Sequence, residues 1–428
     1  MSANAAPDKH THNPVVRYFR ALGPGLVTGA ADDDPSGVTT YAVAGAAFGT
    51  GMLWTAVVTL PLMAAVQLIC ARIGVVSGRG LAGAMRAHYP RWFLYVACVL
   101  LLTANVFNIA ADLAGMADAA EMLTGVTSGL WVPMFGLVVL AATVYTSYAR
   151  FAVSLKWLTA VLFAYVISAF LAHPDWSVAL RDTLVPRLSL DAAYVSTLVG
   201  ILGTTISPYL FFWQASQEVE EERALGRRTV RERHGATAHE LRDVRRDVVT
   251  GMVFSNVVMY FIILAAGATL HRAGHVDIAT SRQAAEALRP LAGDAAYLLF
   301  TLGLVGTGLL AIPVLAGSAS YAVAEVFGWR SGLDLPPRRA RRFYAVLGGS
   351  IVAGALLDSL SVSAVRMMFL SAVVNGLLAA PLLVLVMLVG TNRRIMGRHV
   401  NDRWLNGLGW TATAVMTAAT LLFFWTSL

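Results

Sequence analysis

The sequence is poor in charged residues and has almost no cysteine. Only 13% of its 428 residues are Asp, Glu, Lys or Arg, whereas soluble domains carry about 25%, and this excludes an ordinary soluble protein. The two cysteines, Cys70 and Cys98, lie in apolar stretches. We therefore expect two small buried side chains rather than a disulfide or a metal pair. The apolar runs lack the period-two alternation of a membrane β-barrel.

Several functional signals are also missing from the sequence. Residues 1–14 are polar, and the long apolar segment that follows has no small-residue cleavage site, so no cleavable signal is expected. There is no phosphate-binding loop, which argues against ATP-driven transport. No nucleophile–base pair and no His/Cys cluster is visible at membrane depth. Neither an enzyme nor a resident cofactor is therefore expected.

Long apolar runs are what the sequence does have. Runs of about 20 residues span a bilayer, and 57% of the residues are hydrophobic, which predicts an all-α polytopic membrane protein. We expect eleven spans, at about 15–48, 52–74, 91–123, 130–149, 153–173, 191–217, 248–270, 295–328, 342–358, 363–389 and 405–426. The whole chain, 1–428, is expected to form one transmembrane domain.

Positive charge is distributed unevenly across the predicted membrane. Of the 32 Lys and Arg residues, 26 fall on the side of the N-terminus and five on the other side. Because positive charge concentrates in cytoplasmic segments, we expect a cytoplasmic N-terminus. The abundance of Arg and Ala suggests a bacterial protein and hence an inner-membrane location. The net charge of +7 is then a consequence of topology rather than of nucleic-acid binding, and the lipid bilayer is the expected surrounding.

One long charged stretch interrupts this pattern. Segment 218–247, EVEEERALGRRTVRERHGATAHELRDVRRD, balances eight acids with eight arginines. We expect a solvated cytoplasmic loop or helix pair, with a regulatory or partner-binding role as the alternative.

Two predicted spans carry a proline near their middle. GAADDDPSGV (29–38) contains Pro35 in the first span, and GTTISPYLFF (203–212) contains Pro208 in the sixth. Proline interrupts a helix. The two interrupted spans are five apart, and because five is odd, a repeat of spans 1–5 by spans 6–10 would be inverted in the membrane. We expect these repeats at about 15–173 and 191–389, with an extra span at 405–426. Interrupted helices in corresponding positions indicate a transporter binding site.

Three consecutive aspartates stand at the first interruption. Asp34 followed by Pro35 is the chemistry of a helix N-terminus. Apolar sequence on both sides places the aspartates near mid-membrane, where a charge costs about 2.5–3.5 kcal/mol. We therefore expect a cation site on Asp34 with Asp33 beside it, and Asp32 in the entrance or a proton path. Helix capping alone is the alternative.

Further polar residues lie inside other spans. Asp112 is a single carboxylate deep in the third span, and Asn108 precedes it by one turn on the same face. Intramembrane carboxylates often serve proton relays, so both residues are assigned to a proton pathway or cavity. A structural Asp112, bonded to a neighbouring helix break, is the alternative. Gln214 in the sixth span and Asn375 in the tenth are assigned to the same pathway or cavity.

These motifs resemble the Nramp family of divalent-metal transporters. The resemblance is carried by GPGLVTGAADDDPSG (23–37), PLMAAVQLICARIGVVSGRGLA (61–82), NIAADLAGM (108–116) and LRPLAGDAAYLLFTLGLVGTGLLAIPVLAGSASYAVAE (288–325). It covers spans 1 to 10 in order. It implies a LeuT-type fold of two inverted five-helix repeats plus extra helices, and proton-coupled import of metals such as manganese and iron.

The chain departs from the family pattern in spans 1 and 3. The family carries Asp-Pro-Gly-Asn in span 1, where the Asp and Asn bind metal. Here Asp34 and the following proline match, but Ser36 and Gly37 replace the glycine and the asparagine. In span 3, Asp112 matches the family's proton-linked aspartate, whereas the acid one turn later is Gly115.

Span 6 departs further. The family's Met-Pro-His is Ser207-Pro208-Tyr209 here, so the metal-binding thioether is lost. None of the nine histidines lies inside a predicted span, His173 being the last residue of the fifth, and this removes the family's span 6 proton route. A thioether suits transition metals, whereas Asp34, Ser207, Asp33, Tyr209, carbonyls and water are hard oxygen donors that suit magnesium or hydrated cations. The prediction is a modified site that tolerates magnesium alongside manganese and iron.

The expected mechanism is alternating access. The cation would enter from outside between spans 1, 3, 6, 8 and 10, bind at Asp34, and leave when spans 1 and 6 rock against the other helices. The alternatives are a LeuT-type transporter of another substrate, namely an iron chelate, an amino acid or an amine, and a non-transporting sensor or channel. The divalent metal is the expected substrate and protons the coupling ion. The sequence leaves the oligomeric state open and is compatible with a monomer.

Overall fold

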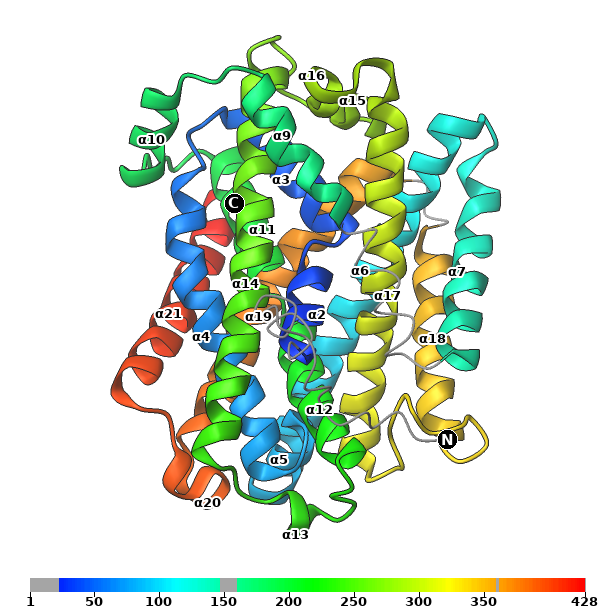
Figure 1. Cartoon of the computed structure of the whole chain (residues 1–428), viewed down its shortest axis with the longest axis vertical. Helices are drawn as coiled ribbons and strands as arrows, with labels where there is room; N and C mark the ends of the chain where they lie inside the picture. The colour runs from blue at the N-terminus through cyan, green and yellow to red at the C-terminus, as the bar shows by residue number, and fades with distance from the viewer. Residues whose placement is uncertain (1–22, 147–159, 359–361, 428) are drawn as a thin grey trace, which may run out of the picture.

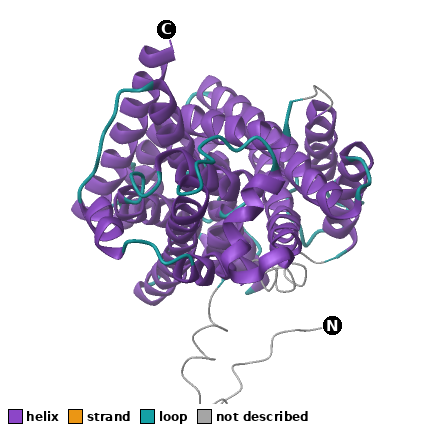
Figure 2. Ribbon diagram, turned by 90° about the horizontal axis from the view of Figure 1, so that it is seen from above, coloured by secondary structure: helices purple, strands orange, loops and turns teal. Residues whose placement is uncertain are grey.

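The computed structural model describes residues 23–146, 160–358 and 362–427, and every regular element in these ranges is a helix (Figure 1; Figure 2). Within them, eight helical stretches are long and apolar enough to cross a membrane. These coincide with predicted spans 2, 3, 4, 6, 7, 8, 10 and 11. The prediction of an all-helical, multi-pass membrane protein is confirmed.

The longer elements are α4 (Trp54–Ser77), α6 (Arg91–Thr124), α7 (Ser128–Tyr145), α14 (Ala238–Ala266), α17 (Ala296–Phe327), α18 (Arg341–Asp358), α19 (Ala364–Thr391) and α21 (Arg403–Ser427). Shorter helices connect them: α5 (Leu81–His88), α9 (Phe163–Leu171), α10 (Trp176–Leu184), α13 (Val230–Arg233), α15 (Ser281–Ala285), α16 (Arg289–Ala292) and α20 (Arg393–Met396). Single turns of 3₁₀ helix occur at Ala160–Leu162, Glu286–Leu288, Gly293–Ala295 and Gly397–His399, and a π turn continues α14 over Gly267–His271.

Both predicted interruptions are present. The first span is divided into α2 (Pro24–Asp32) and α3 (Pro35–Phe48), and the sixth into α11 (Ala192–Thr205) and α12 (Pro208–Ala224). In each pair the second helix begins at the proline, which supplies no N–H and is pre-set for the first helical position. Part of the predicted fifth span, residues 147–159, lies outside the described residues. The division into two inverted repeats stays a prediction.

The broken helices lie at the centre of the molecule. Figure 1 shows α2 and α3 one above the other, flanked by α14 and α17. α14 packs against α2, α3 and α4, and α6 packs against α7, α17, α18 and α19. The surrounding surface is apolar, with Leu137 on α7 67% exposed and Leu421 on α21 65% exposed, as expected for side chains that face lipid.

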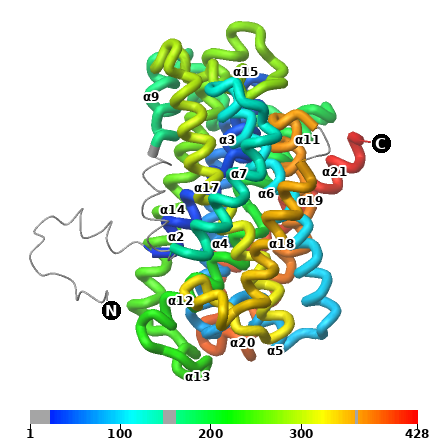
Figure 3. Tube along the Cα trace, turned by 90° about the vertical axis from the view of Figure 1, so that its right-hand side faces the viewer, coloured from blue at the N-terminus to red at the C-terminus, as the bar shows by residue number. Residues whose placement is uncertain are grey.

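The connecting helices gather at the two ends of the bundle. α5, α13 and α20 lie at one end, and α15 lies at the other, in the views of both Figure 1 and Figure 3. The α5, α13 and α20 end carries the arginine-rich connections that the charge distribution assigns to the cytoplasm. Of the two halves of the first broken helix, α2 lies nearer this end and α3 nearer the opposite one.

Candidate metal-transport site

The first helix break is built around Asp34. This residue has an extended backbone and caps α3, and its Oδ1 accepts the N–H of Gly37 at 2.7 Å. Pro35 occupies the first position of α3. The predicted N-terminal capping is therefore confirmed, and it takes place in the interior, because only 3% of Asp34 is exposed.

The second break is tied to the first by Tyr209. The phenol hydroxyl of Tyr209 donates to the carbonyl oxygen of Ala31 at 2.8 Å, close to the end of α2. The last carbonyls of a helix have no partner within it, so this bond satisfies one of them. Ser207 caps α12 by its backbone position, while its hydroxyl donates back to the carbonyls of Thr204 (2.6 Å) and Gly203 (3.0 Å). Its oxygen lone pairs are not used by these bonds.

Asn108 brings an amide directly onto the Asp34 carboxylate. Its Nδ2 donates to Asp34 Oδ2 at 2.6 Å, and its Oδ1 accepts from the Nδ2 of Asn375 at 2.9 Å and from the hydroxyl of Ser371. The hydroxyl of Ser36 lies 2.9 Å from Asp34 Oδ1 and 3.1 Å from Asn108 Oδ1. Residue 37 is a glycine, and the amide that contacts Asp34 comes from Asn108 on α6.

Asp112 lies at the edge of this cluster. Its Oδ1 accepts the N–H of Ser36 at 3.3 Å, and its Oδ2 has no hydrogen-bond partner although the residue is fully buried. A buried polar atom without a partner is costly. The bond from Ser36 to Oδ1 agrees with a structural Asp112 that is bonded to the neighbouring helix break. The free Oδ2 is an acceptor that a proton pathway could use. Both interpretations of Asp112 therefore stay open.

Asp32 and Asp33 bond to a different helix from Asp34. The hydroxyl of Ser255, on α14, lies 2.7 Å from Asp32 Oδ2 and 3.2 Å from Asp33 Oδ1. Asp32 Oδ1 and Asp33 Oδ2 have no partner. The structure does not gather the three aspartates into one carboxylate cluster, and within the described residues no group of three or more His, Cys, Asp or Glu converges to hold a metal ion.

Gln214, on α12, connects this helix to α2. Its Oε1 accepts from the hydroxyl of Thr28, and its Nε2 donates to Glu218 Oε1 at 2.8 Å. Gln214 therefore links α2 to α12, the two half-helices that lie on the same side of the breaks. Asn375, in contrast, lies with Asn108 as described above.

Several residues of the site were missed from the sequence. Ser36 lies inside the quoted motif of the first span, but the sequence gave no reason to assign it to the site. It was noted only as a replacement of the family's glycine. Ser371 precedes Asn375 by one helical turn, and this spacing is the signal that could have identified it. Ser255 and Thr28 gave no signal, because their roles come from contacts with residues far away in the sequence.

Comparison with known proteins identifies the family. Residues 25–426 match the model of the natural resistance-associated macrophage protein-like family, Nramp. The divalent metal cation transporter MntH of Klebsiella pneumoniae is 28% identical over 93% of this chain and 92% of its own, and MntH 1 of Pseudomonas aeruginosa is 28% identical over 96% and 93%.

The fold is shared with solved transporters. The manganese transporter of Eremococcus coleocola superposes with a TM-score of 0.72 at 19% identity, covering 97% of this chain and 88% of that one. Mhp1, a nucleobase-cation-symport-1 family transporter, gives a TM-score of 0.55 at 14% identity over 94% and 92%. These likenesses confirm the predicted LeuT-type fold. The predicted resemblance is confirmed as well: the chain belongs to the Nramp family, a family of divalent metal cation transporters and not of enzymes.

Proposed function

We propose that the protein is a secondary-active importer of divalent metal cations and that Asp34 is the central metal ligand. The observation that carries the proposal is a buried carboxylate at the break between α2 and α3. An ionised carboxylate has about four acceptor positions, and Asp34 uses three, toward Gly37, Asn108 and Ser36. One position is left for a cation. The names of the bacterial MntH relatives support this substrate class.

The ligands that we propose beside Asp34 are oxygens. The hydroxyl of Ser207, the phenol oxygen of Tyr209 and the free Oδ2 of Asp33 are the remaining candidates, together with backbone carbonyls at the breaks and water. Hard oxygen donors suit magnesium and hydrated cations, whereas discrimination in favour of softer metals needs sulfur or nitrogen. The proposed site therefore tolerates magnesium or hydrated cations alongside manganese and iron.

Proton coupling is proposed to run through Asp112. Its free Oδ2 is buried and lies one turn from Asn108. Asp32, which also keeps a free oxygen, belongs to the same proposed pathway or cavity, as do Asn375 and Gln214. The charge distribution and the bacterial relatives support a bacterial inner membrane with a cytoplasmic N-terminus.

Uptake into proteoliposomes tests the proposal. Initial rates are measured for manganese, iron, magnesium and calcium with the wild type and with Asp34→Ala. The matched control is Asp118→Ala, which removes a carboxylate of α6 whose hydrogen-bond partner in the described residues is the N–H of Ser281. Saturable uptake of magnesium and manganese that Asp34→Ala alone abolishes supports the site.

Two outcomes would contradict parts of the proposal. Manganese uptake that is indifferent to excess magnesium would overturn the hard-oxygen argument and leave the metal importer intact. Absence of uptake for every free cation would overturn the metal importer itself, in favour of a chelated metal or an organic substrate.

A further inference from the structure

The charged segment 218–247 consists of two helix ends joined by a loop, which is one of the two expected forms, and most of its side chains are solvent-accessible, but four of its charged side chains are buried. α12 continues to Ala224 and α14 already begins at Ala238, because Thr237 and Glu240 form a reciprocal N-terminal capping box. Glu218, Glu222, Arg233 and Asp247 are between 3% and 6% exposed. The expectation of a solvated segment is therefore wrong for these four side chains, since they fold against α2, α4 and each other.

A cavity of about 150 Å³ lies beneath the start of α2. Gly23 and Pro24 line it together with residues of α4, α12 and α14. Six carboxylates line it, those of Glu218, Glu221, Glu222, Glu240, Asp243 and Asp247, and Arg227 is its basic lining residue. Glu222 is 4% exposed, and its Oε2 has no hydrogen-bond partner. A buried carboxylate oxygen without a donor is stabilised by a cation.

Asp247 holds the first turn of α2 against α14. Its Oδ1 accepts the N–H groups of Gly23 (2.9 Å) and Leu26 (3.1 Å), and its Oδ2 accepts the N–H of Gly25 (2.6 Å). One carboxylate thus satisfies three of the free N–H groups at the start of the helix, where negative charge is also favoured by the helix dipole.

The backbones of α2 and α14 are in direct contact over the first turns of α2. A side chain at Gly29 would place its Cβ 2.2 Å from the carbonyl oxygen of Gly251, and one at Gly25 would place it 2.6 Å from the N of Val248. No space therefore exists between α2 and α14 over this turn. On the face of α2 that meets α14, a cation moving from Asp34 toward the cavity therefore passes only if the two helices separate.

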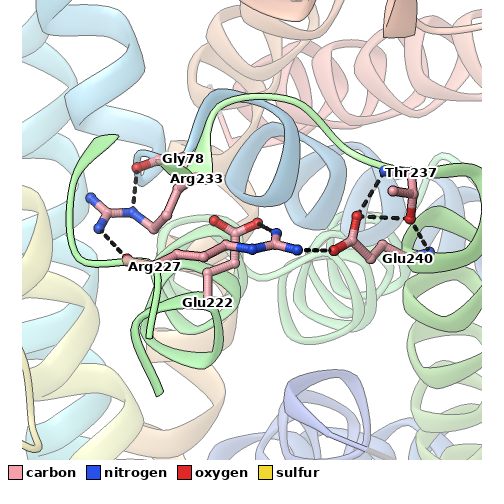
Figure 4. Close-up of polar contacts among 6 residues, drawn as sticks. All are labelled: Gly78, Glu222, Arg227, Arg233, Thr237 and Glu240. Carbon is pink, nitrogen blue, oxygen red and sulfur yellow. Dashed lines mark hydrogen bonds and ion pairs between the residues drawn. The ribbon is translucent and has the colours of Figure 1, made fainter. Parts of the chain in front are cut away.

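Arg227 joins α12 to α14 at the cavity (Figure 4). Its guanidinium contacts Glu222 Oε1 at 3.3 Å and hydrogen-bonds to Glu240 Oε1. Arg233 fixes the backbone of this loop, since its NH1 donates to the carbonyl of Arg227 at 3.0 Å and its Nε to the carbonyl of Gly78 at 3.2 Å. Arg227 is therefore a tethered positive charge that lies among the carboxylates a departing cation would meet.

We infer that Asp247 and Arg227 form the latch of the inner gate: Asp247 pins α2 to α14, and Arg227 holds α12 to α14 until a cation takes its place among the cavity carboxylates. The inference rests on the proposed import function. Transport then requires the latch to open, so weakening it raises the population in which α2 has separated from α14 and the Asp34 break is connected to the cavity.

Cysteine labelling in nanodiscs tests the latch without any metal. Cys70 and Cys98 are replaced by serine, and Val75→Cys, buried in the cavity wall on α4, reports on opening by its rate of reaction with a charged maleimide. Leu225→Cys, which lines the same cavity but is 69% exposed, shows that the reagent reaches the cavity mouth in every variant.

Asp247→Ala is expected to raise the labelling rate at Val75→Cys about tenfold, the usual effect of losing a helix cap. Asp247→Asn is expected to give a smaller rise, because asparagine also caps helices. The matched control is Asp243→Ala, which removes a carboxylate from the same cavity and helix but one that pairs with His239 and Arg246 rather than with α2. It should label at the wild-type rate.

Arg227→Gln gives an independent test, with Arg228→Gln as its exposed neighbour and control. Arg227→Gln should raise labelling several-fold and Arg228→Gln should not. Folded Asp247→Ala and Arg227→Gln proteins that label at the wild-type rate would overturn the latch. Equal increases for Asp243→Ala and Asp247→Ala would also overturn it, since charge alone would explain them. Because no metal is present, a failed latch is distinguishable from a failed import function, which wild-type uptake decides.

Discussion

Replacing Asn108 by alanine should impair transport far more than the loss of one buried asparagine normally would. Asn108 donates to Asp34 Oδ2 at 2.6 Å and accepts from Ser371 and Asn375. The Asn108→Ala variant leaves one oxygen of Asp34 without its donor and leaves two α19 side chains without their acceptor. The carboxylate is then free to rotate away from the position in which it meets the cation.

The magnitude follows from the type of bond that is lost. A hydrogen bond to a charged group contributes about 1.5–3 kcal/mol, which corresponds to about 10- to 150-fold in an equilibrium constant. Residues that orient a metal ligand show a similar range, about 10- to 100-fold in affinity or activity. We therefore expect kcat/KM for manganese uptake to fall at least tenfold in Asn108→Ala.

The chain offers a close control on the same helix. Asn105 is also fully buried, one turn earlier on α6, and its Nδ2 donates to Leu315 O and Ser318 Oγ of α17, both at 2.7 Å. Asn105→Ala creates a similar cavity and similar unpaired groups, but none at the helix break. Initial uptake rates and thermal stability are measured for both variants in proteoliposomes. Rates within threefold of one another would refute the role assigned to Asn108, whatever the two stabilities are.

Three further substitutions probe the same region. Ser207→Met should restore a soft donor and shift the competition between manganese and magnesium toward manganese, measured as the magnesium concentration that halves manganese uptake; an unchanged value would mean that residue 207 does not face the cation. Tyr209→Phe removes the bond to the carbonyl of Ala31 and should cost about 1 kcal/mol of stability, measured by thermal unfolding in detergent, and unaltered stability would contradict the tie between the two breaks. Gly29→Ala should reduce folded yield, because its Cβ would lie 2.2 Å from a carbonyl oxygen of α14, whereas Gly129→Ala, with no atom within 4 Å of its Cβ, should express normally.

The sequence by itself determined the features that depend on neighbouring residues. Apolar run length predicts the spans, because backbone groups inside lipid must pair within a helix. Asp34 with Pro35 predicts the start of α3, since capping and proline geometry act within one turn. Pro208 predicts the second break for the same reason. The order of these motifs along the chain also indicated the family, because motif order is a property of sequence.

Only the tertiary structure decided which polar groups meet. Asp33 and Asp34 are adjacent in sequence, yet one bonds to Ser255 on α14 and the other to Asn108 on α6. Contacts between helices also explain why Glu222 is buried in a segment whose sequence predicts a solvated loop. α12 continues past the apolar part of the sixth span, and the face that carries Glu222 still packs against the bundle. The physical reason is that contacts between helices depend on their rotation and register, which are set by packing across the whole bundle. Local patterns specify where a helix begins and ends, but they leave open which neighbouring helix each of its faces will meet.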